Sequence, residues 1–363
     1  AREVTRAPAE GAMPSRPRLD EQPSRGAPVT TLVYVDDESG LRIRRRRCGR
    51  GFVYVDAAGA RVTNAEESRR IRALAIPPAW TDVRICADPA GHIQASGRDS
   101  RGRKQYCYHA DWQHVRDAAK LQELVRFGEA LPRLRVRVRR DLRRQGLCRS
   151  RVLALVVDLL DRTLIRVGSD IYARQNGSFG LTTLTKHHVA ARGEKLRFRF
   201  TGKSGKQWDV GLADRRLARV VRRCQELPGQ RLFQYTDGDG AVHAVDSADV
   251  NAYLREIGGE GVTSRRFRTW AATVGVANRL VGEPAPRTRR EETRAINRAL
   301  DEMAVRLGNT RAICRKSYVL PAVLESFAAG ELGAAFARMA GYRRRGLTAA
   351  EARLLAWLRE RQA

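Results

Sequence analysis

The spacing of apolar residues changes near residue 112, and this change constrains the fold more than any other feature of the sequence. Before it, short runs rich in β-branched and aromatic residues, such as 51–55, are separated by turn signals such as 88–91. After it, longer apolar runs follow helical spacing. The pattern predicts an α+β chain, in which a small β-rich N-terminal domain (31–112) precedes a mostly helical domain (113–363).

The N-terminal part contains three further features. Segments 31–35 and 51–55 are expected to be strands, and 65–74 is expected to be a helix. Residues 1–30 are rich in Pro, Arg, Ala, Gly and Glu and lack any apolar periodicity, so we expect them to form a disordered arm. Because this arm has charges but no apolar stretch, it does not resemble a secretory signal.

The larger domain is predicted to carry one β-hairpin among its helices. Residues 195–200 alternate strictly between charged and apolar side chains, which is typical of a strand with one buried face. Gly202 and Gly205 then indicate a tight turn into a second strand, 207–212.

Helices are expected on both sides of this hairpin. The apolar run 151–160 predicts a buried helix, and 293–307 places an apolar stripe on one helical face, ending at Gly308. The pair Thr348 and Glu351 has the spacing of a capping box and predicts the start of the last helix.

The balance of charge points to a polyanionic partner. The chain has 363 residues, with 69 Lys and Arg against 40 Asp and Glu, and a formal net charge of +29. Binding to a phosphate backbone releases condensed counterions, which favours a chain of this charge. The hydrophobic fraction of 42% is ordinary for a globular protein. No run of 18 uncharged apolar residues occurs, so no membrane-spanning helix is predicted.

The six cysteines are scattered and form no CxxC pair. This spacing argues against a zinc site and against a disulfide framework, and it fits a reducing cytoplasm. We therefore interpret them as buried or half-buried thiols.

Several common catalytic motifs are excluded. Residues 202–204 have the ending of a phosphate-binding P-loop, but Arg197 stands where its first glycine is required, and the surroundings predict strand–turn–strand. No HExxH, GxSxG or paired-carboxylate motif occurs. What remains is a set of cations and one tyrosine: Arg166, Lys203, Arg268 and Tyr318.

The local sequences around these residues resemble one known family, the type IB DNA topoisomerases of the poxvirus-like and bacterial branch. The similarity extends from about residue 40 to 330 and includes Gly97–Tyr108, which is similar to the DNA-clamping segment of that branch. The family's functional residues occur in the order Arg, Lys, Arg, His or its replacement, and Tyr. In this sequence they fall on Arg166, Lys203, Arg268, Asn309 and Tyr318.

The resemblance implies a bilobed clamp that closes on double-stranded DNA and relaxes supercoils. Tyr318 would attack a phosphodiester to form a 3′-phosphotyrosine, the free strand would rotate, and religation would follow without ATP, cofactor or metal. Arg166 and Arg268 would donate charge-assisted hydrogen bonds to the phosphoryl oxygens. Lys203 would protonate the departing 5′ oxygen. Asn309, in the place of a histidine, would donate one neutral hydrogen bond.

The resemblance also implies where the protein acts and which residues grip the duplex. We expect a monomer that acts in the cytoplasm in association with the nucleoid. Cations that hold phosphates and aromatic rings that stack on sugars or bases are expected together on one strand face. The DNA-binding residues predicted in this way are Arg98, Arg103, Lys104, Gln105, Tyr106 and Tyr108.

Two other functions remain open from the sequence. Tyrosine recombinases use the same Arg, Lys, Arg and Tyr chemistry, but they usually carry a histidine where this chain has Arg265, and a helical domain in place of the β-rich one. A nucleoid-binding protein without enzymatic activity is the second alternative, because the net charge alone would suffice for it.

Overall fold

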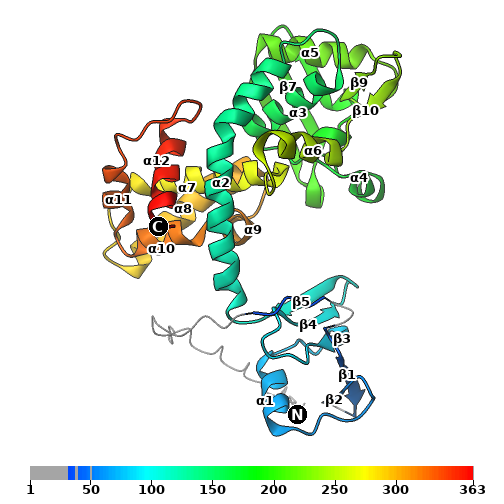
Figure 1. The fold of residues 1–363 in the computed structure, drawn as a ribbon, viewed down its shortest axis with the longest axis vertical. Helices are drawn as coiled ribbons and strands as arrows, with labels where there is room; N and C mark the ends of the chain where they lie inside the picture. Colours follow the sequence, from blue (N-terminus) through cyan, green and yellow to red (C-terminus); the bar gives the residue numbers. More distant parts are fainter. Residues whose placement is uncertain (1–31, 37–39, 50, 363) are drawn as a thin grey trace, which may run out of the picture. The chain divides into compact units, whose positions relative to one another are not determined.

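The computed structural model describes residues 32–36, 40–49 and 51–362, and the arm expected at 1–30 lies outside them (Figure 1). The chain divides into two compact units, and the division falls between residues 115 and 116. This point lies in the first turns of helix α2 (Trp112–Asp141), whose first residue is the predicted domain boundary. Among the described residues, no helix has both the length and the apolar character needed to cross a bilayer.

The first unit is built on a five-stranded antiparallel sheet with the strand order β2-β1-β3-β4-β5. Its strands are β1 (Ile43–Cys48), β2 (Gly51–Val55), β3 (Thr81–Ile85), β4 (Ile93–Arg98) and β5 (Lys104–Tyr108). One face packs against helix α1 (Ala65–Ala73) around a small core of Ile43, Ile71, Val83, Ile85 and Ala95. The strand predicted at 51–55 and the helix predicted at 65–74 are therefore confirmed.

The strand expected at 31–35 is wrong for the part of it that the structure describes. Residues 32–36 contain only an isolated bridge, in which Val33 pairs with Gly91. The amide of Val35 is the next one that could extend the pairing. It donates to Nδ1 of the His92 side chain at 3.1 Å and not to a strand carbonyl. The ladder of backbone hydrogen bonds therefore stops after one residue.

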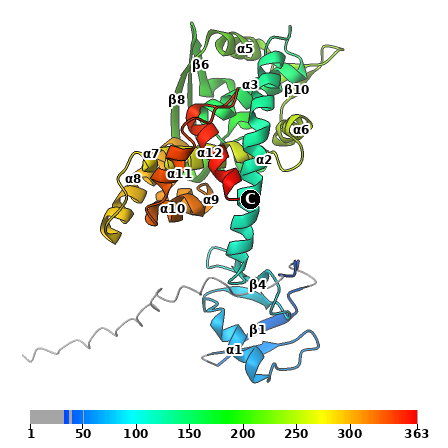
Figure 2. The same ribbon diagram turned by 60° about the vertical axis from the view of Figure 1, so that its left-hand side comes forward.

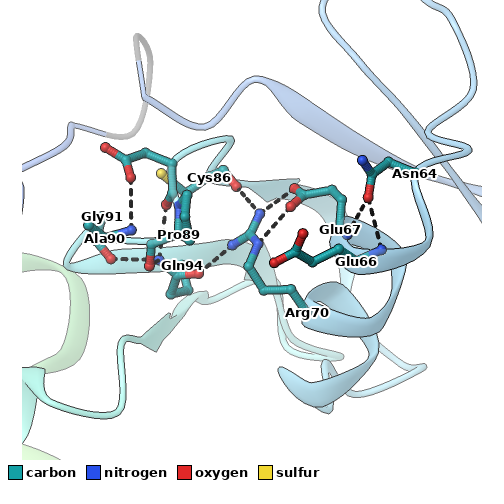
Figure 3. Close-up of polar contacts among 10 residues, drawn as sticks. Asn64, Glu66, Glu67, Arg70, Cys86, Pro89, Ala90, Gly91 and Gln94 are labelled. Carbon is teal, nitrogen blue, oxygen red and sulfur yellow. Dashed lines mark hydrogen bonds and ion pairs between the residues drawn. The ribbon is translucent and has the colours of Figure 1, made fainter.

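A half-buried arginine, Arg70, joins α1 to the sheet (Figure 3). Arg70 donates to both carboxylate oxygens of Glu67, one turn earlier, to the side-chain oxygen of Gln94 on β4, and to the backbone carbonyl of Cys86. Gln94 in turn donates to the carbonyl of Gly91 at 2.7 Å. Asn64 caps the first turn of the helix. These bonds fix the helix on the core face of the sheet.

The second unit is mostly helical. Its helices are α2, α3 (Arg149–Thr163), α4 (Asp170–Asn176), α5 (Arg215–Glu226), α6 (Ser247–Gly258), α7 (Ser264–Val281), α8 (Arg289–Leu307), α9 (Arg311–Ser317), α10 (Pro321–Ala328), α11 (Leu332–Arg338) and α12 (Ala349–Glu360). Helix α7 lies at the centre and contacts α3, α6, α8, α10, α11 and α12 (Figures 1 and 2). The helices that pack around α7 therefore share one continuous hydrophobic core.

Three predicted helices are confirmed, and one of them begins earlier than expected. The run 151–160 lies in α3, which is buried along most of its length. Thr348 and Glu351 form the capping box of α12. The helix expected from residue 293 begins at Arg289, because Thr288 forms a capping box with Glu291 one turn before the apolar stripe starts.

The hairpin is confirmed, but it belongs to a larger sheet. Strands β7 (Lys195–Thr201) and β8 (Gln207–Ala213) pair as predicted, and β6 (Val189–Arg192) adds a third antiparallel strand. A second small hairpin consists of β9 (Gln234–Thr236) and β10 (Val242–Ala244). These additional strands are three or four residues long, too short to show an alternating pattern in the sequence.

Candidate active site

Arg166 lies on a tightly held segment after α3. The helix ends at Leu164 in a left-handed conformation (φ 59°), and the chain then runs beside the segment that begins at Gly180. The amide of Leu181 donates to the Arg166 carbonyl at 2.8 Å. A Cβ on Gly180 would lie 2.5 Å from that same oxygen and 2.7 Å from Cα of Gly168. Only glycine allows this close approach, which fixes the backbone that carries the arginine.

The Arg166 guanidinium joins two residues that lie far away along the chain. Nη1 donates to the Tyr318 hydroxyl at 2.7 Å, and Nη2 donates to Oδ1 of Asn309 at 2.9 Å. A planar guanidinium presents its N–H groups as a fixed fork, so it holds both partners in one plane. Arg166 therefore sets the phenol oxygen and the amide at neighbouring positions.

Arg268 on α7 lies deeper, and only 2% of its surface is exposed. Its terminal nitrogens donate to the backbone carbonyls of Leu164 and Leu307, the latter at 2.7 Å. The guanidinium carbon lies 5.1 Å from the centre of the Tyr318 ring. Burial, together with the like charge of Arg166, lowers the pKa of Arg268 to about 10. The group therefore stays charged at neutral pH, and its positive charge is held against the phenol.

Tyr318 is the C-cap residue of α9, and its ring is almost entirely buried. Its backbone is held from two sides. The buried hydroxyl of Thr273 on α7 shares its proton between the carbonyls of Thr269, at 2.9 Å, and Tyr318, at 3.2 Å, and it accepts from the Leu320 amide at 3.3 Å. The ammonium of Lys120 on α2 donates to the carbonyl of Val319, the residue after Tyr318, at 2.6 Å. Thr273 and Lys120 are not among the residues predicted from the sequence. No local pattern marks them, because each acts on a residue at least 45 positions away.

The surroundings of Tyr318 favour its ionised form. Burial by itself raises the pKa of the phenol, but the charges of Arg268 and Arg166 and their hydrogen bonds outweigh this effect. The net pKa of Tyr318 therefore lies below its ordinary value. A phenol that ionises more readily is a better nucleophile at neutral pH.

Asn309 and Lys203 complete the group. Asn309 follows Gly308, the residue that ends α8, and its buried Nδ2 has no hydrogen-bond partner within the described structure. An amide donor in such a place is satisfied when an acceptor enters the site. Lys203 lies in the β7–β8 turn, where Ser204 (φ 64°) and Gly205 (φ 72°) both adopt left-handed conformations.

One cavity brings all five residues together. It has a volume of about 990 Å³, and its lining includes Arg166, Lys203, Arg268, Asn309 and Tyr318. They come from the loop after α3, the β7–β8 turn, α7, the loop after α8 and the end of α9. Arg265 and Lys206 also line this cavity, although neither was predicted to be a site residue. Each lies three residues from a predicted site residue, Arg268 or Lys203. This spacing could have indicated them, because residues three apart lie on the same face of a helix or in the same turn.

The strand face expected to bind DNA is only partly as predicted. Lys104, Tyr106 and Tyr108 alternate along β5 and share one face, with the two tyrosine rings 6.0 Å apart. Gln105 belongs to the opposite face because successive strand residues point to opposite sides, and it donates to Asp99 at 3.0 Å. The expectation that it shares the face of the tyrosines is therefore wrong.

The two remaining predicted residues, Arg98 and Arg103, are both exposed. Arg98 at the end of β4 pairs directly with Lys104 on β5, so two cations lie opposite each other on that face. Arg103 lies in the turn between these strands and forms an ion pair with Asp99 at 2.8 Å. Arg98 also forms an ion pair with Asp82 at 3.6 Å, which offsets part of the repulsion between the two facing cations.

Three exposed arginines on the same face were missed. Arg44 pairs with Arg84, Arg84 with Ser96, and Ser96 with Tyr106, so these residues form one row across the sheet. Arg46 follows on the same side of β1. With Arg98 and Lys104 they line a hollow of about 500 Å³. The signal in the sequence was the arginine run within 44–47, read at the strand period of two.

The structure also bears on the residues of the P-loop-like ending and on the cysteines. Residues 202–204 lie between two strands, which is not the strand–turn–helix arrangement of a P-loop. Among the cysteines, Cys86, Cys224 and Cys314 are buried thiols, and Cys107 and Cys148 are half-buried. Cys48 is exposed near the end of an edge-side strand pair, so the interpretation of all six as buried or half-buried thiols is wrong for this residue.

Comparison with known proteins agrees with this geometry. Residues 109–330 match the family described as the catalytic core of eukaryotic DNA topoisomerase I, and residues 51–99 match the N-terminal domain of bacterial DNA topoisomerase IB. The chain is 33% identical to DNA topoisomerase 1B of Acanthamoeba polyphaga mimivirus over 78% of its length and 87% of the relative. It is 26% identical to DNA topoisomerase 1B of vaccinia virus (strain Copenhagen) over 30% of its length and 34% of the relative. The chain therefore belongs to the type IB DNA topoisomerases and is an isomerase that acts on DNA.

Proposed function

We propose that this enzyme relaxes supercoiled duplex DNA through a transient single-strand break, a 3′-phosphotyrosine intermediate, strand rotation and religation. The observation that carries this proposal is the position of Arg166, whose guanidinium contacts the hydroxyl of Tyr318 and the amide of Asn309 at once. A phosphoryl group bound beside these atoms meets a nucleophile and hydrogen-bond donors together.

Tyr318 is the nucleophile in this proposal. Its oxygen attacks the phosphorus as the bond to the 5′ oxygen breaks, and the phenolic proton passes to solvent. The lowered pKa of Tyr318 supports this role, because it increases the phenolate fraction at neutral pH. The buried ring can approach the phosphorus only along the direction that the cavity allows.

Arg166, Arg268 and Asn309 stabilise the pentacoordinate transition state, whose non-bridging oxygens gain negative charge. Each guanidinium keeps its charge and holds further N–H donors beyond those used for positioning. The unpartnered Nδ2 of Asn309 supplies a neutral donor. Donors that are held by the fold in this way need little reorganisation when the charge develops, which supports their role.

Lys203 acts as the general acid. When the phosphorus–oxygen bond breaks, the 5′ oxygen receives a proton from the ammonium and leaves as a hydroxyl. In religation the same hydroxyl attacks the phosphotyrosine, the proton returns to Lys203, and the phenolate of Tyr318 leaves. One phosphodiester replaces another at each step, so the cycle requires no ATP.

The exposed sheet face of the first unit binds duplex phosphates. Its arginine row and Lys104 provide the positive charge, and Tyr106 and Tyr108 provide flat surfaces for sugars or bases. A net charge of +29 extends this attraction to DNA of any sequence.

Substitution of Tyr318 by Phe tests the assignment of the nucleophile. We expect the variant to bind duplex DNA as tightly as the wild type and to show no plasmid relaxation without ATP or Mg²⁺. Tyr342→Phe is the matched control, since it removes an exposed hydroxyl that contacts only Arg359 among the described residues. Mapping of the covalent adduct completes the test. A link through another residue, or to a 5′ end, would contradict the proposal.

A further inference from the structure

Trp208 lies on β8 behind the catalytic cavity, and neither the chemistry above nor the cavity lining includes it. Its indole is half-buried and stacks on Phe200 of β7, with ring centres 5.9 Å apart and an angle of 5° between the planes. The stacking holds the indole in one orientation. Its free edge therefore has a fixed direction relative to the sheet.

That edge touches Gly202, the residue before Lys203. A Cβ at Gly202 would lie 2.6 Å from Nε1 and 2.7 Å from Cδ1 of Trp208. The Gly202 backbone is extended, with φ of −94°, a conformation that any residue adopts. The glycine is therefore required here by the space that the indole occupies and not by backbone conformation.

The same edge touches Gly308, the residue before Asn309. A Cβ there would lie 2.7 Å from Cζ2 and 3.0 Å from Cε2 of Trp208. Gly308 also adopts a left-handed conformation (φ 59°) as the residue that ends α8. One indole thus lies in direct contact with the two glycines that immediately precede two residues of the catalytic cavity.

We propose that Trp208 is a positioning residue that holds the turn carrying Lys203 in place, with the backbone at Gly308 as its support. The inference rests on the proposed role of Lys203 as the general acid. A lysine has a long and flexible side chain, so its reach is useful only if its backbone is held in place. A displacement of about 1 Å in such a group can lower a rate by about 10²-fold.

A double-mutant cycle between Trp208→Ala and Lys203→Ala provides the first test. We expect each single variant to slow single-turnover cleavage, Trp208→Ala by about 10- to 100-fold, without weakening DNA binding. We expect the double variant to be no slower than Lys203→Ala alone, because Trp208 acts through that lysine. If the rate of the double variant instead falls by the product of the two single losses, the inference is overturned, whatever chemical role Lys203 has.

A second substrate tests the role of the lysine separately. If the 5′ bridging oxygen is replaced by sulfur, the leaving group is a thiolate, which departs without a proton. We expect this substrate to restore cleavage by both Lys203→Ala and Trp208→Ala to within about tenfold of the wild type. If cleavage by Lys203→Ala is not restored, Lys203 is not the general acid. The double-mutant cycle then still decides whether Trp208 acts through Lys203. Restoration of Lys203→Ala but not of Trp208→Ala overturns that inference.

Two further variants guard against simple misfolding. Gln207→Ala is the matched control on the same strand, because its side chain pairs with Thr201 and not with the two glycines. We expect it to cleave at the wild-type rate. Gly202→Ala adds the methyl group that the indole excludes, and we expect slow cleavage that Trp208→Phe partly restores in the double variant. If Trp208→Phe makes Gly202→Ala slower still, the two residues do not share the space inferred here.

Discussion

Replacement of Arg166 by Ala should slow the chemistry strongly and in a pH-dependent way. The guanidinium holds the Tyr318 hydroxyl at 2.7 Å and Asn309 at 2.9 Å, so the variant loses two hydrogen bonds in which one partner is charged. Each is worth about 1.5 to 3 kcal/mol. A total loss of about 3 to 6 kcal/mol in the transition state corresponds to a decrease of about 10²- to 10⁴-fold in the cleavage rate.

The loss should also depend on pH. The positive charge of Arg166 is one of the causes that hold the pKa of Tyr318 below its ordinary value. Without this charge the pKa rises, and the phenolate fraction at neutral pH falls. The ratio of wild-type to variant rates should therefore be greatest near neutral pH and should shrink as the pH rises and both phenols ionise.

The assay is single-turnover formation of the covalent adduct on a short duplex, measured at saturating enzyme from neutral to alkaline pH, with affinity measured by filter binding. Arg315→Ala is the matched control, because Arg315 is an exposed cation on α9 that does not line the cavity. We expect the control to cleave at the wild-type rate. A rate for Arg166→Ala within about threefold of the wild type would refute the positioning argument. A rate ratio that is independent of pH would refute the electrostatic argument.

Two other predictions concern the sheet face and the helical core. Arg84→Ala should weaken binding to duplexes of every sequence, and the slope of log binding constant against log salt concentration should become shallower by about one. The cleavage rate at saturating DNA should not change. A slope equal to that of the wild type would show that this arginine contacts no phosphate. In the core, Glu351 accepts hydrogen bonds from Arg135 and from the indole of Trp270. Burial alone would raise the pKa of Glu351, but the hydrogen bonds and the charge of Arg135 outweigh burial and lower the pKa below its ordinary value. The ionised carboxylate therefore stabilises the fold when the pH is above its ordinary pKa, and this stabilisation is lost as the pH falls through the lowered pKa. Glu351→Ala should lower the free energy of unfolding at neutral pH by about 3 to 5 kcal/mol, measured by chemical denaturation. The free energy of unfolding of the variant should also change less than that of the wild type as the pH is lowered. A denaturant midpoint equal to that of the wild type would contradict this account.

The features that the sequence predicted correctly are those with a local cause. The stripe of α8, the capping box of α12 and the alternation of β7 each follow from backbone geometry that repeats within a few residues. The order of the five cavity residues was also readable, because each lies in a local sequence that resembles the type IB family.

The features that the sequence left undetermined, or that were predicted wrongly, depend on contacts between distant segments. Residues 32–36 make one bridge and no strand because the next amide pairs with a histidine side chain. Gln105 lies in the expected strand, but the pairing of that strand in the sheet decides which residues share its face. Neither result follows from the composition of the segment itself.

The sequence by itself therefore determined the elements that carry a clear local pattern, the family and the chemical types of the cavity residues. Only the tertiary structure decided that one guanidinium joins Tyr318 to Asn309, that Thr273 holds the tyrosine backbone, and that Trp208 lies against two glycines. The physical reason is that periodicity comes from the backbone within a few residues, whereas these contacts join residues that are far apart along the chain. Such residues come into contact only when the whole core packs.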